Sequence, residues 1–271
     1  MQPAELIDAV ADIAHEAGQA ILEIYESDFD VEHKDDDSPL TRADMASHRI
    51  IARRLRELTP ELPVISEEDG LPPFAERSAW PRYWLIDPLD GTREFVKRND
   101  EFTVNIALID GGRPVLGVVD VPVLGLSYRA AEGYGATRSD DGGAPVAIRV
   151  PAESADPPRI VGSRSHRGAS LDGFLDALGP HELVPLGSSL KFCRVAEGAA
   201  DLYPRFGPTS EWDTAAAQAV VEQAGGRVLR LDGQPLDYNR KEDILNPHFV
   251  VIGPQDRDWL GLAATLQRDG A

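Results

Sequence analysis

Apolar residues recur every three or four positions near the beginning of the chain, the spacing of an amphipathic helix. Over residues 3–25 this pattern predicts a helix with Pro3 in its first turn. Its apolar side is made of Leu6, Ile7, Val10, Ile13, Ala14, Ala17, Ile21 and Ile24. A second helix is predicted over residues 41–58. Thr41 is its candidate N-cap, and Asp44 three residues later completes a pair like a capping box.

The pattern then changes to short apolar or alternating runs, which predict strands. Val64-Ile65 is a short buried strand that leads into an acidic turn at residues 66–70. A second buried run ends at Asp87, and we expect Pro88 to stop this strand because proline has no N–H for a ladder. Further runs at 102–110, 113–121 and 125–131, separated by turns, predict an antiparallel sheet of several hairpins.

Beyond residues 139–158, which are rich in Asp, Gly, Ala and Pro, strands alternate with helices. Strands are predicted at 159–162, 182–186, 200–203, 226–229 and 249–252, and helices at 168–178, 187–198, 211–224 and 259–267. This change predicts an α+β lobe at residues 1–152 packed on an α/β lobe at residues 153–271.

Composition narrows the classes of function. The formal net charge of -19 over 271 residues argues against binding of nucleic-acid polymers, which need a basic face. An anionic substrate would need metal ions or a few well-placed cations. The single cysteine, Cys193, excludes an internal disulfide and fits a reducing cytoplasm. We find neither a signal peptide nor an integral membrane segment, and we expect a cytoplasmic protein. A monomer and a homodimer both stay open, as does loose attachment to the inner face of a membrane.

Four acidic residues follow apolar strands or open helices: Glu67, Asp87, Asp90 and Asp213. Each has a purely structural alternative, since Asp90-Gly91 is a common tight turn, Glu67 belongs to an acidic turn, and Asp213 can cap a helix. If the four converge, their mutual repulsion raises their pKa values unless divalent cations neutralise them. Oxygen ligands without cysteine or paired histidine favour Mg²⁺ or Mn²⁺ over Zn²⁺.

Two such ions can activate a water and stabilise a leaving oxygen, and Thr92 stands beside these acids in the sequence, able to orient that water. Other hydrolase chemistries lack their motifs here. An aspartyl-phosphate phosphatase of the haloacid dehalogenase type needs Asp-x-Asp, whereas this chain has Asp-x-x-Asp at Asp87 and Asp90. A serine hydrolase of the nucleophile-elbow type needs G-x-S-x-G, which does not occur.

Three segments resemble the inositol monophosphatase superfamily of Mg²⁺-dependent, lithium-sensitive phosphatases, in residues, order and spacing. They are Ser66-Glu67-Glu68, Asp87-Pro88-Leu89-Asp90-Gly91-Thr92 and Trp212-Asp213-Thr214-Ala215-Ala216. Residues 163–166, 187–193 and 203–209 further resemble its 3'(2'),5'-bisphosphate nucleotidases (CysQ type). The resemblance implies a layered αβαβα sandwich.

The resemblance also implies roles for individual residues. Glu67, Asp87 and the carbonyl of Leu89 would hold one Mg²⁺, while Asp87, Asp90 and Asp213 would hold a second. Glu67 would also touch a weaker third ion. Asp44 and Thr92 would orient and activate the attacking water. The full set implied to contact the substrate is Glu67, Asp90, Gly91, Thr92, Ser163, His166, Ser188, Lys191, Arg205 and Asp213. Lys34, in the acidic loop after a short predicted strand at 31–34, would approach the metals or the phosphate.

The activity implied is hydrolysis of the 3'-phosphate of adenosine 3',5'-bisphosphate, or of its sulfated form 3'-phosphoadenylyl sulfate, in sulfur assimilation. Inositol monophosphate or fructose 1,6-bisphosphate is the alternative substrate within the superfamily. A non-catalytic nucleotide-binding protein on the same fold is the alternative from another class.

Overall fold

The computed structural model describes residues 1–27, 39–164 and 169–263 of the chain. Its larger sheet has seven strands in sequence order: β1 (Val64–Ser66), β2 (Arg82–Asp90), β3 (Thr103–Asp110), β4 (Arg113–Val121), β5 (Leu126–Ala131), β6 (Gly135–Asp140) and β7 (Val146–Ala147). Strands β1 and β2 run parallel, and every other neighbouring pair is antiparallel. The predicted hairpins are therefore confirmed.

The smaller sheet has five strands in the order β11 (Arg227–Arg230), β12 (Phe249–Ile252), β10 (Leu202–Arg205), β8 (Arg159–Ser163) and β9 (Glu182–Leu186). Strands β10, β8 and β9 are parallel, with β9 at the edge, and β12 is antiparallel to both β10 and β11. The two sheets fall on either side of residues 148–158. The division into lobes at residues 152 and 153 stays a prediction.

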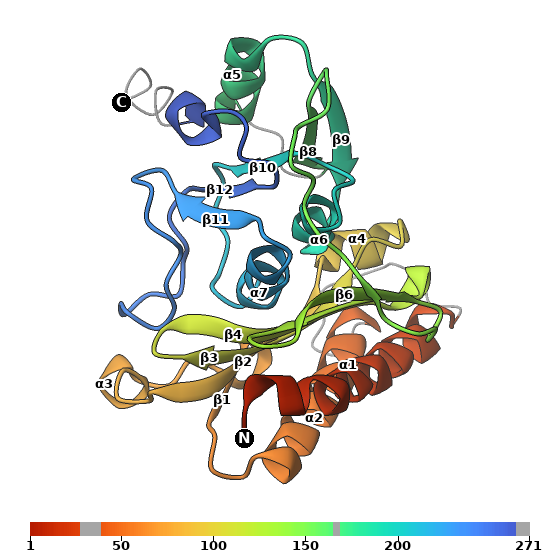
Figure 1. The fold of residues 1–271 in the computed structure, drawn as a ribbon. Helices are drawn as coiled ribbons and strands as arrows, with labels where there is room; N and C mark the ends of the chain where they lie inside the picture. Colours follow the sequence, from red (N-terminus) through yellow and green to blue (C-terminus); the bar gives the residue numbers. More distant parts are fainter. Residues whose placement is uncertain (28–38, 165–168, 264–271) are drawn as a thin grey trace.

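The helices complete five layers (Figure 1). Helices α1 (Pro3–Tyr25) and α2 (Pro39–Leu58) cover one face of the larger sheet. Helices α6 (Leu190–Ala196) and α7 (Ala215–Gln223) lie between the two sheets, and α5 (Ala169–Leu178) packs with Trp259 on the outer face of the smaller one. Short helices occupy the connections: η1 (Glu67–Asp69), α3 (Phe74–Arg77), α4 (Thr92–Lys97) and η2 (Pro122–Leu124). The expected αβαβα sandwich is confirmed.

The alternation of side chains along β2 determines toward which face of the larger sheet the Asp87 carboxylate points. Tyr83 and Leu85 belong to the core that contains α6 and α7, whereas Trp84 and Ile86 pack against α1 and α2. Because side chains alternate between the faces of a strand, Asp87 continues the row of Tyr83 and Leu85. Its carboxylate is thereby directed between the sheets, toward the layer that holds α7.

Two boundary predictions were wrong. Pro88 does not stop β2, which continues to Asp90; the register with β3 shifts between Asp87 and Asp90, and an irregularity of this kind tolerates a residue without an N–H. Helix α2 begins at Pro39, so Thr41 lies within its first turn and Asp44 has no place in a capping pair at Thr41. Proline suits the first turn of a helix, where its missing N–H has no partner to lose.

Two helices begin later than predicted. Helix α7 starts at Ala215 instead of residue 211, because residues 211–214 form turns in which Ser210 N–H donates to Asp213 Oδ2 (2.9 Å). Helix α6 starts at Leu190 instead of residue 187, because Ser188 has a positive φ of 44°. The predicted strand at 31–34, Lys34, His166 and the end of the 259–267 helix lie outside the described residues.

Candidate metal centre and adjoining cleft

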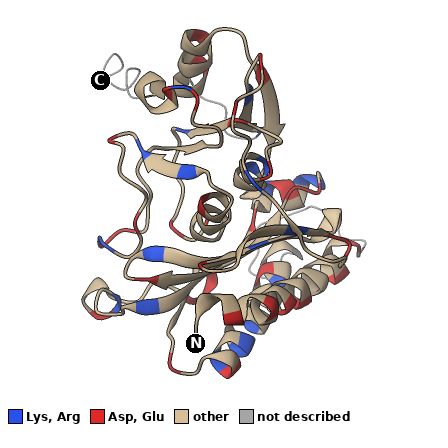
Figure 2. Cartoon of the chain, in the orientation of Figure 1, with Lys and Arg blue, Asp and Glu red and all other residues tan. Residues whose placement is uncertain are grey.

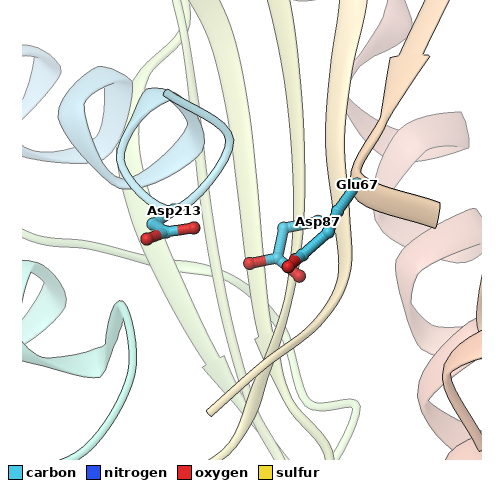
Figure 3. Close-up of side chains that lie close together, drawn as sticks. All are labelled: Glu67, Asp87 and Asp213. Atoms are coloured by element: carbon cyan, nitrogen blue, oxygen red, sulfur yellow. The ribbon is translucent and has the colours of Figure 1, made fainter. Parts of the chain in front are cut away.

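Three carboxylates from distant parts of the sequence meet at one edge of the larger sheet (Figure 3). Each of Glu67, Asp87 and Asp213 offers one oxygen, and these oxygens lie within 4.8 Å of one another. Because β1 and β2 are parallel, with Ser66 paired to Ile86, the residues that follow the two strands stand side by side. Asp213 approaches from the turn that precedes α7. The sequence analysis grouped these three acids with Asp90, and the fold brings the three together.

The electrostatics of this cluster favour a bound cation. Burial and the neighbouring Asp90 raise the pKa of Glu67 to about 7 and that of Asp213 to about 8. The same two causes raise the pKa of Asp87, which is 1% exposed, well above its usual range. None of the three forms a salt bridge with a lysine or arginine of the described residues. Divalent cations would relieve this repulsion, and the all-oxygen donor set fits a hard metal ion.

Asp90 stands beside this cluster but is held differently. Its Oδ2 accepts the backbone N–H of Ser189 (2.6 Å) and lies 2.8 Å from the Ser189 hydroxyl. That hydroxyl also lies 2.7 Å from the carbonyl oxygen of Asp213 and accepts from the Asn105 side-chain amide (2.9 Å). Ser189 therefore joins the two acidic segments of the site. Sequence reasoning chose the adjacent Ser188 as a binding residue and missed this role.

Helix α2 presents Asp44 to the same edge. Ser47 donates its hydroxyl to the carbonyl of Pro88 (2.8 Å), and His48 Nδ1 lies 2.9 Å from Ser66 Oγ, so α2 is tied to both strands that end in acids. Asp44 is 9% exposed, and its pKa is raised to about 8 by burial and by Glu68 and Glu67. The implied pairing of Asp44 with Thr92 stays a prediction, because no hydrogen bond in the described part of the chain joins them.

Gly91 allows the chain to turn between the acidic segment that ends β2 and α4. Its φ of +96° is unfavourable for residues with a side chain. A Cβ at this position would lie 3.2 Å from Phe102 Cα and 3.2 Å from Ser188 Cβ. Glycine is therefore required both by the conformation and by the close approach of these two neighbours.

A cleft of about 290 Å³ continues from Asp90 and Asp213 toward the smaller sheet. Of the residues implied by resemblance to contact substrate, its lining includes Asp90, Gly91, Thr92, Ser163, Ser188, Lys191, Arg205 and Asp213. His166 lies outside the described residues, and Glu67 belongs to the adjoining carboxylate cluster. Sequence reasoning did not select Phe192, Tyr203 and Thr209, which also line the cleft.

Two cations, Lys191 and Arg205, line the same cleft as Asp90 and Asp213. Lys191 is 6% exposed, donates to the carbonyl of Ser188, and lies 5.5 Å from the centre of the Tyr203 ring. Burial lowers its pKa to about 8, although Asp90 opposes the shift. Arg205 donates from Nη2 to the carbonyl of Pro208 (2.7 Å), while its buried Nε has no partner among the described residues. The cleft thus offers positive charge beside the carboxylate cluster.

A salt bridge outside the predicted set supports the wall of this cleft. Arg164 makes two bonds to the carboxylate of Glu101, at 2.6 and 3.1 Å. The same carboxylate accepts the N–H of Gly187 (2.8 Å), which precedes Ser188. The segments 163–166 and 187–193 had been quoted for their resemblance, but Arg164 was not selected, because nothing in the sequence reveals its distant partner Glu101.

Comparison with known proteins agrees with this geometry. Residues 2–267 match the model of the inositol monophosphatase family. The chain is 52% identical over 248 residues to the 3'(2'),5'-bisphosphate nucleotidase CysQ of Escherichia coli strain K12, a match that covers 91% of this chain and 99% of the relative.

Solved structures give the same result. The crystal structure of CysQ from Bacteroides thetaiotaomicron aligns with a TM-score of 0.85 at 44% identity, covering 93% of this chain and 98% of that one. Inositol monophosphatase from Anabaena aligns with a TM-score of 0.75 at 25% identity, covering 97% of this chain and 94% of that one.

Among residues 1–27, 39–164 and 169–263, no helix has both the length and the apolar character of a membrane span. The chain belongs to the inositol monophosphatase family.

Proposed function

We propose that this chain is a metal-dependent phosphatase that removes the 3'-phosphate of adenosine 3',5'-bisphosphate, giving AMP and phosphate. The observation that carries the proposal is the direct continuity between an all-carboxylate cluster and a cleft containing Lys191 and Arg205. A substrate with two separated phosphates matches this arrangement, because one phosphate meets the metal centre and the other meets the cations. The 52% identity to a 3'(2'),5'-bisphosphate nucleotidase supports the same substrate class.

We propose that Mg²⁺, replaceable by Mn²⁺, is the metal. Glu67, Asp87 and the carbonyl of Leu89 would hold one ion, and Asp87, Asp90 and Asp213 a second, with Glu67 also touching a weaker third. Bound divalent ions supply Lewis-acid polarisation of a phosphoryl group and acidify a water. The chain prepares the ligands: Asp87 Oδ1 accepts the N–H of Leu89 (3.1 Å), and Ser189 holds Oδ2 of Asp90.

The remaining steps belong to residues around the cluster. Asp44 and Thr92 orient the attacking water, and a carboxylate oxygen of Asp44 takes its proton. The backbone amides of Gly91 and Thr92 donate to the phosphate that is removed. Attack opposite the leaving 3'-oxygen forms the new P–O bond, breaks the bond between phosphorus and the 3'-oxygen, and inverts the phosphoryl group; the released 3'-oxygen takes a proton from solvent water. Asp87 and Asp44 are largely buried, so electrostatic contacts at their carboxylates are screened less than they would be at the surface.

The nucleotide is held by the other side of the cleft. We propose that Lys191 and Arg205 bind the 5'-phosphate, and that Ser163, Ser188 and His166 contact the rest of the nucleotide. The phosphosulfate of 3'-phosphoadenylyl sulfate places an anion in the same position, so we expect it to be a second substrate. Hydrolysis of adenosine 3',5'-bisphosphate would then remove a by-product of sulfate activation.

Phosphate release with Mg²⁺ tests the proposal. Adenosine 3',5'-bisphosphate should be preferred over inositol 1-phosphate and fructose 1,6-bisphosphate by about a hundredfold in kcat/KM, or about 2.7 kcal/mol in transition-state binding. Preference for a sugar phosphate would keep the metal chemistry and overturn the substrate. Absence of release from all three, with Mg²⁺ or Mn²⁺, would favour a nucleotide-binding protein without catalysis.

A further inference from the structure

A second cavity, of about 470 Å³, lies between α1 and the end of the larger sheet formed by β4, β5 and β6. It shares no lining residue with the catalytic cleft. Its lining includes Asp12, His15 and Gln19 from α1, Asp120 from β4, Ser127 and Arg129 from β5, and Ser139 and Asp141 at the end of β6. The cavity is therefore a separate place at which a ligand can contact this fold.

The floor of this cavity is a row of buried polar side chains. Asp120 pairs in register with Ser127, which pairs with Ser139, so the three stand side by side across three strands. They are 4, 8 and 3% exposed. Two residues earlier on β4, Val118 packs in the core beneath α1, the environment expected for this face. Polar residues have thus replaced core residues where the sheet meets the cavity.

This row is only partly satisfied from within the described part of the chain. Ser139 Oγ is buried without a hydrogen-bond partner. Asp120 forms no salt bridge there, and burial raises the pKa of its carboxyl to about 6 despite opposition from His15, Ser127 and Arg129. Arg129 is directed partly elsewhere, with Nη1 3.7 Å from Asp8. Buried polar groups in folded proteins almost always have partners, so the Ser139 hydroxyl is open to a donor from a ligand, while Asp120, which has Ser127 beside it, is open to a countercharge.

Helix α1 is shaped to leave room for the carboxylate of Asp120. A Cβ at Gly18 would lie 2.9 Å from Asp120 Oδ2 and 3.0 Å from Pro122 Cγ. Glycine within a helix costs about 1 kcal/mol relative to alanine, so it is unfavourable at this position unless the space is needed. The missing side chain at Gly18 therefore lets α1 pack directly against Asp120 Oδ2, and Asp120 itself lines the cavity.

The charges around the cavity define the class of ligand. Three lining carboxylates, on Asp12, Asp120 and Asp141, outnumber the two basic side chains of the lining, Arg129 and His15. Further acidic residues lie along α1 (Figure 2). An anion such as a nucleotide or free phosphate would be repelled, whereas an ammonium group would supply a donor to Ser139 Oγ and a countercharge to Asp120.

We propose that this cavity binds a short aliphatic diamine, with one ammonium on Asp120 and the other near Ser139 and Asp141. Strands β4 and β6 are separated by two strand spacings, roughly 10 Å, so acceptors lie at both ends of the polar row. A ligand with two ammonium groups uses both ends, whereas a monoamine uses one. The proposal is independent of the catalytic function, because the two sites share no residue.

Isothermal titration calorimetry with 1,4-diaminobutane tests this site, using Mg²⁺-loaded protein at about 0.15 M salt so that the catalytic acids are neutralised and weak surface attraction is screened. Asp120→Asn should weaken binding about tenfold or more and Ser139→Ala about threefold, because each removes one acceptor. Asp176→Asn, which removes an exposed charge on α5, is the matched control and should bind as the parent does. Butane-1,4-diol should bind far more weakly.

Three results would overturn the proposal. No heat of binding from the parent protein would exclude a diamine site. Equal affinity in Asp120→Asn, Ser139→Ala and the Asp176→Asn control would show that the acidic chain attracts diamines without a site. Equal binding of the diol would show that the cavity selects hydroxyl groups and not cations. Thermal melting identifies any variant that fails to fold. If Asp120→Asn fails to fold, the test rests on the binding measured with Ser139→Ala.

Discussion

Ser189 holds Asp90 through two groups on one oxygen, a backbone N–H at 2.6 Å and a hydroxyl at 2.8 Å, although 99 residues separate them. The same hydroxyl lies 2.7 Å from the carbonyl oxygen of Asp213. A single hydroxyl proton serves one of these two acceptors at a time. Ser189 therefore positions the acidic motif on β2 relative to the segment that precedes α7.

Replacing Ser189 with alanine should loosen Asp90 while leaving the backbone N–H contact in place. Hydrogen bonds to charged groups contribute about 1.5–3 kcal/mol, so we expect Mg²⁺ affinity and kcat/KM each to fall about tenfold. Steady-state kinetics over a range of Mg²⁺ concentrations measure both effects. Ser78→Ala, at an exposed position, is the control. Parent-like Mg²⁺ dependence in Ser189→Ala would contradict the role assigned to this hydroxyl.

Lys191→Met tests the binding of the second phosphate. Methionine keeps an alkyl side chain against Tyr203 and removes the charge, so the variant should fold without a large cavity. We expect KM for adenosine 3',5'-bisphosphate to rise about tenfold to a hundredfold, with a much smaller change for 3'-AMP, which has no 5'-phosphate. Lys97→Met, at an exposed position on α4, is matched in charge. Equal changes in KM for both substrates would remove the assigned contact.

Gly91→Ala should impair folding and activity for two separable reasons. The new Cβ meets a strained φ of +96° and also crowds Phe102 and Ser188 at 3.2 Å. Gly133→Ala is a matched control, because Gly133 has a φ of +80° with nothing within 4 Å of its added Cβ. We expect Gly133→Ala to lose about 1 kcal/mol of unfolding free energy and Gly91→Ala measurably more. Chemical denaturation of both compares them, and equal losses would remove the crowding argument.

Metal-free protein should be stabilised by acid over part of the pH range. The pKa values of Glu67, Asp44 and Asp213 are raised to about 7, 8 and 8, from ordinary values near 4. The folded state therefore binds protons more tightly than the unfolded state. These groups favour folding most below about pH 4, and their contribution declines as the pH rises through about 8.

Differential scanning calorimetry measures this effect. After chelation, we expect Tm to fall between about pH 5 and pH 8, and added Mg²⁺ to raise Tm more at the higher pH, where protons do not compete. Asp87→Asn should reduce both effects, since it removes one of the repelling carboxylates while keeping Oδ1 as an acceptor for Leu89. A Tm shift by Mg²⁺ that is the same at both pH values would contradict this interpretation.

The local pattern of apolar and polar residues was sufficient to predict most helices and strands. The helix at residues 3–25 and the strand at residues 249–252 match their predicted bounds, because continuous periodicity requires no distant information. The errors fall where tertiary contacts override local rules. Pro88 lies in an irregularity of β2 that only the pairing with β3 reveals. Ser188 takes a positive φ beside Gly91, and α6 therefore begins after it.

By itself, the sequence determined most of the helices and strands and singled out the acidic motifs, because local periodicity and motif spacing are properties of short segments. The layered sandwich and the metal-ligand roles came only from the resemblance to the inositol monophosphatase superfamily. Only the tertiary structure decided that Ser189 holds Asp90, that Arg164 pairs with Glu101, and that Asp120 and Ser139 face a second cavity. These relationships depend on strand register and on the packing of layers. Both are set by contacts between residues far apart in the chain, which no short segment records.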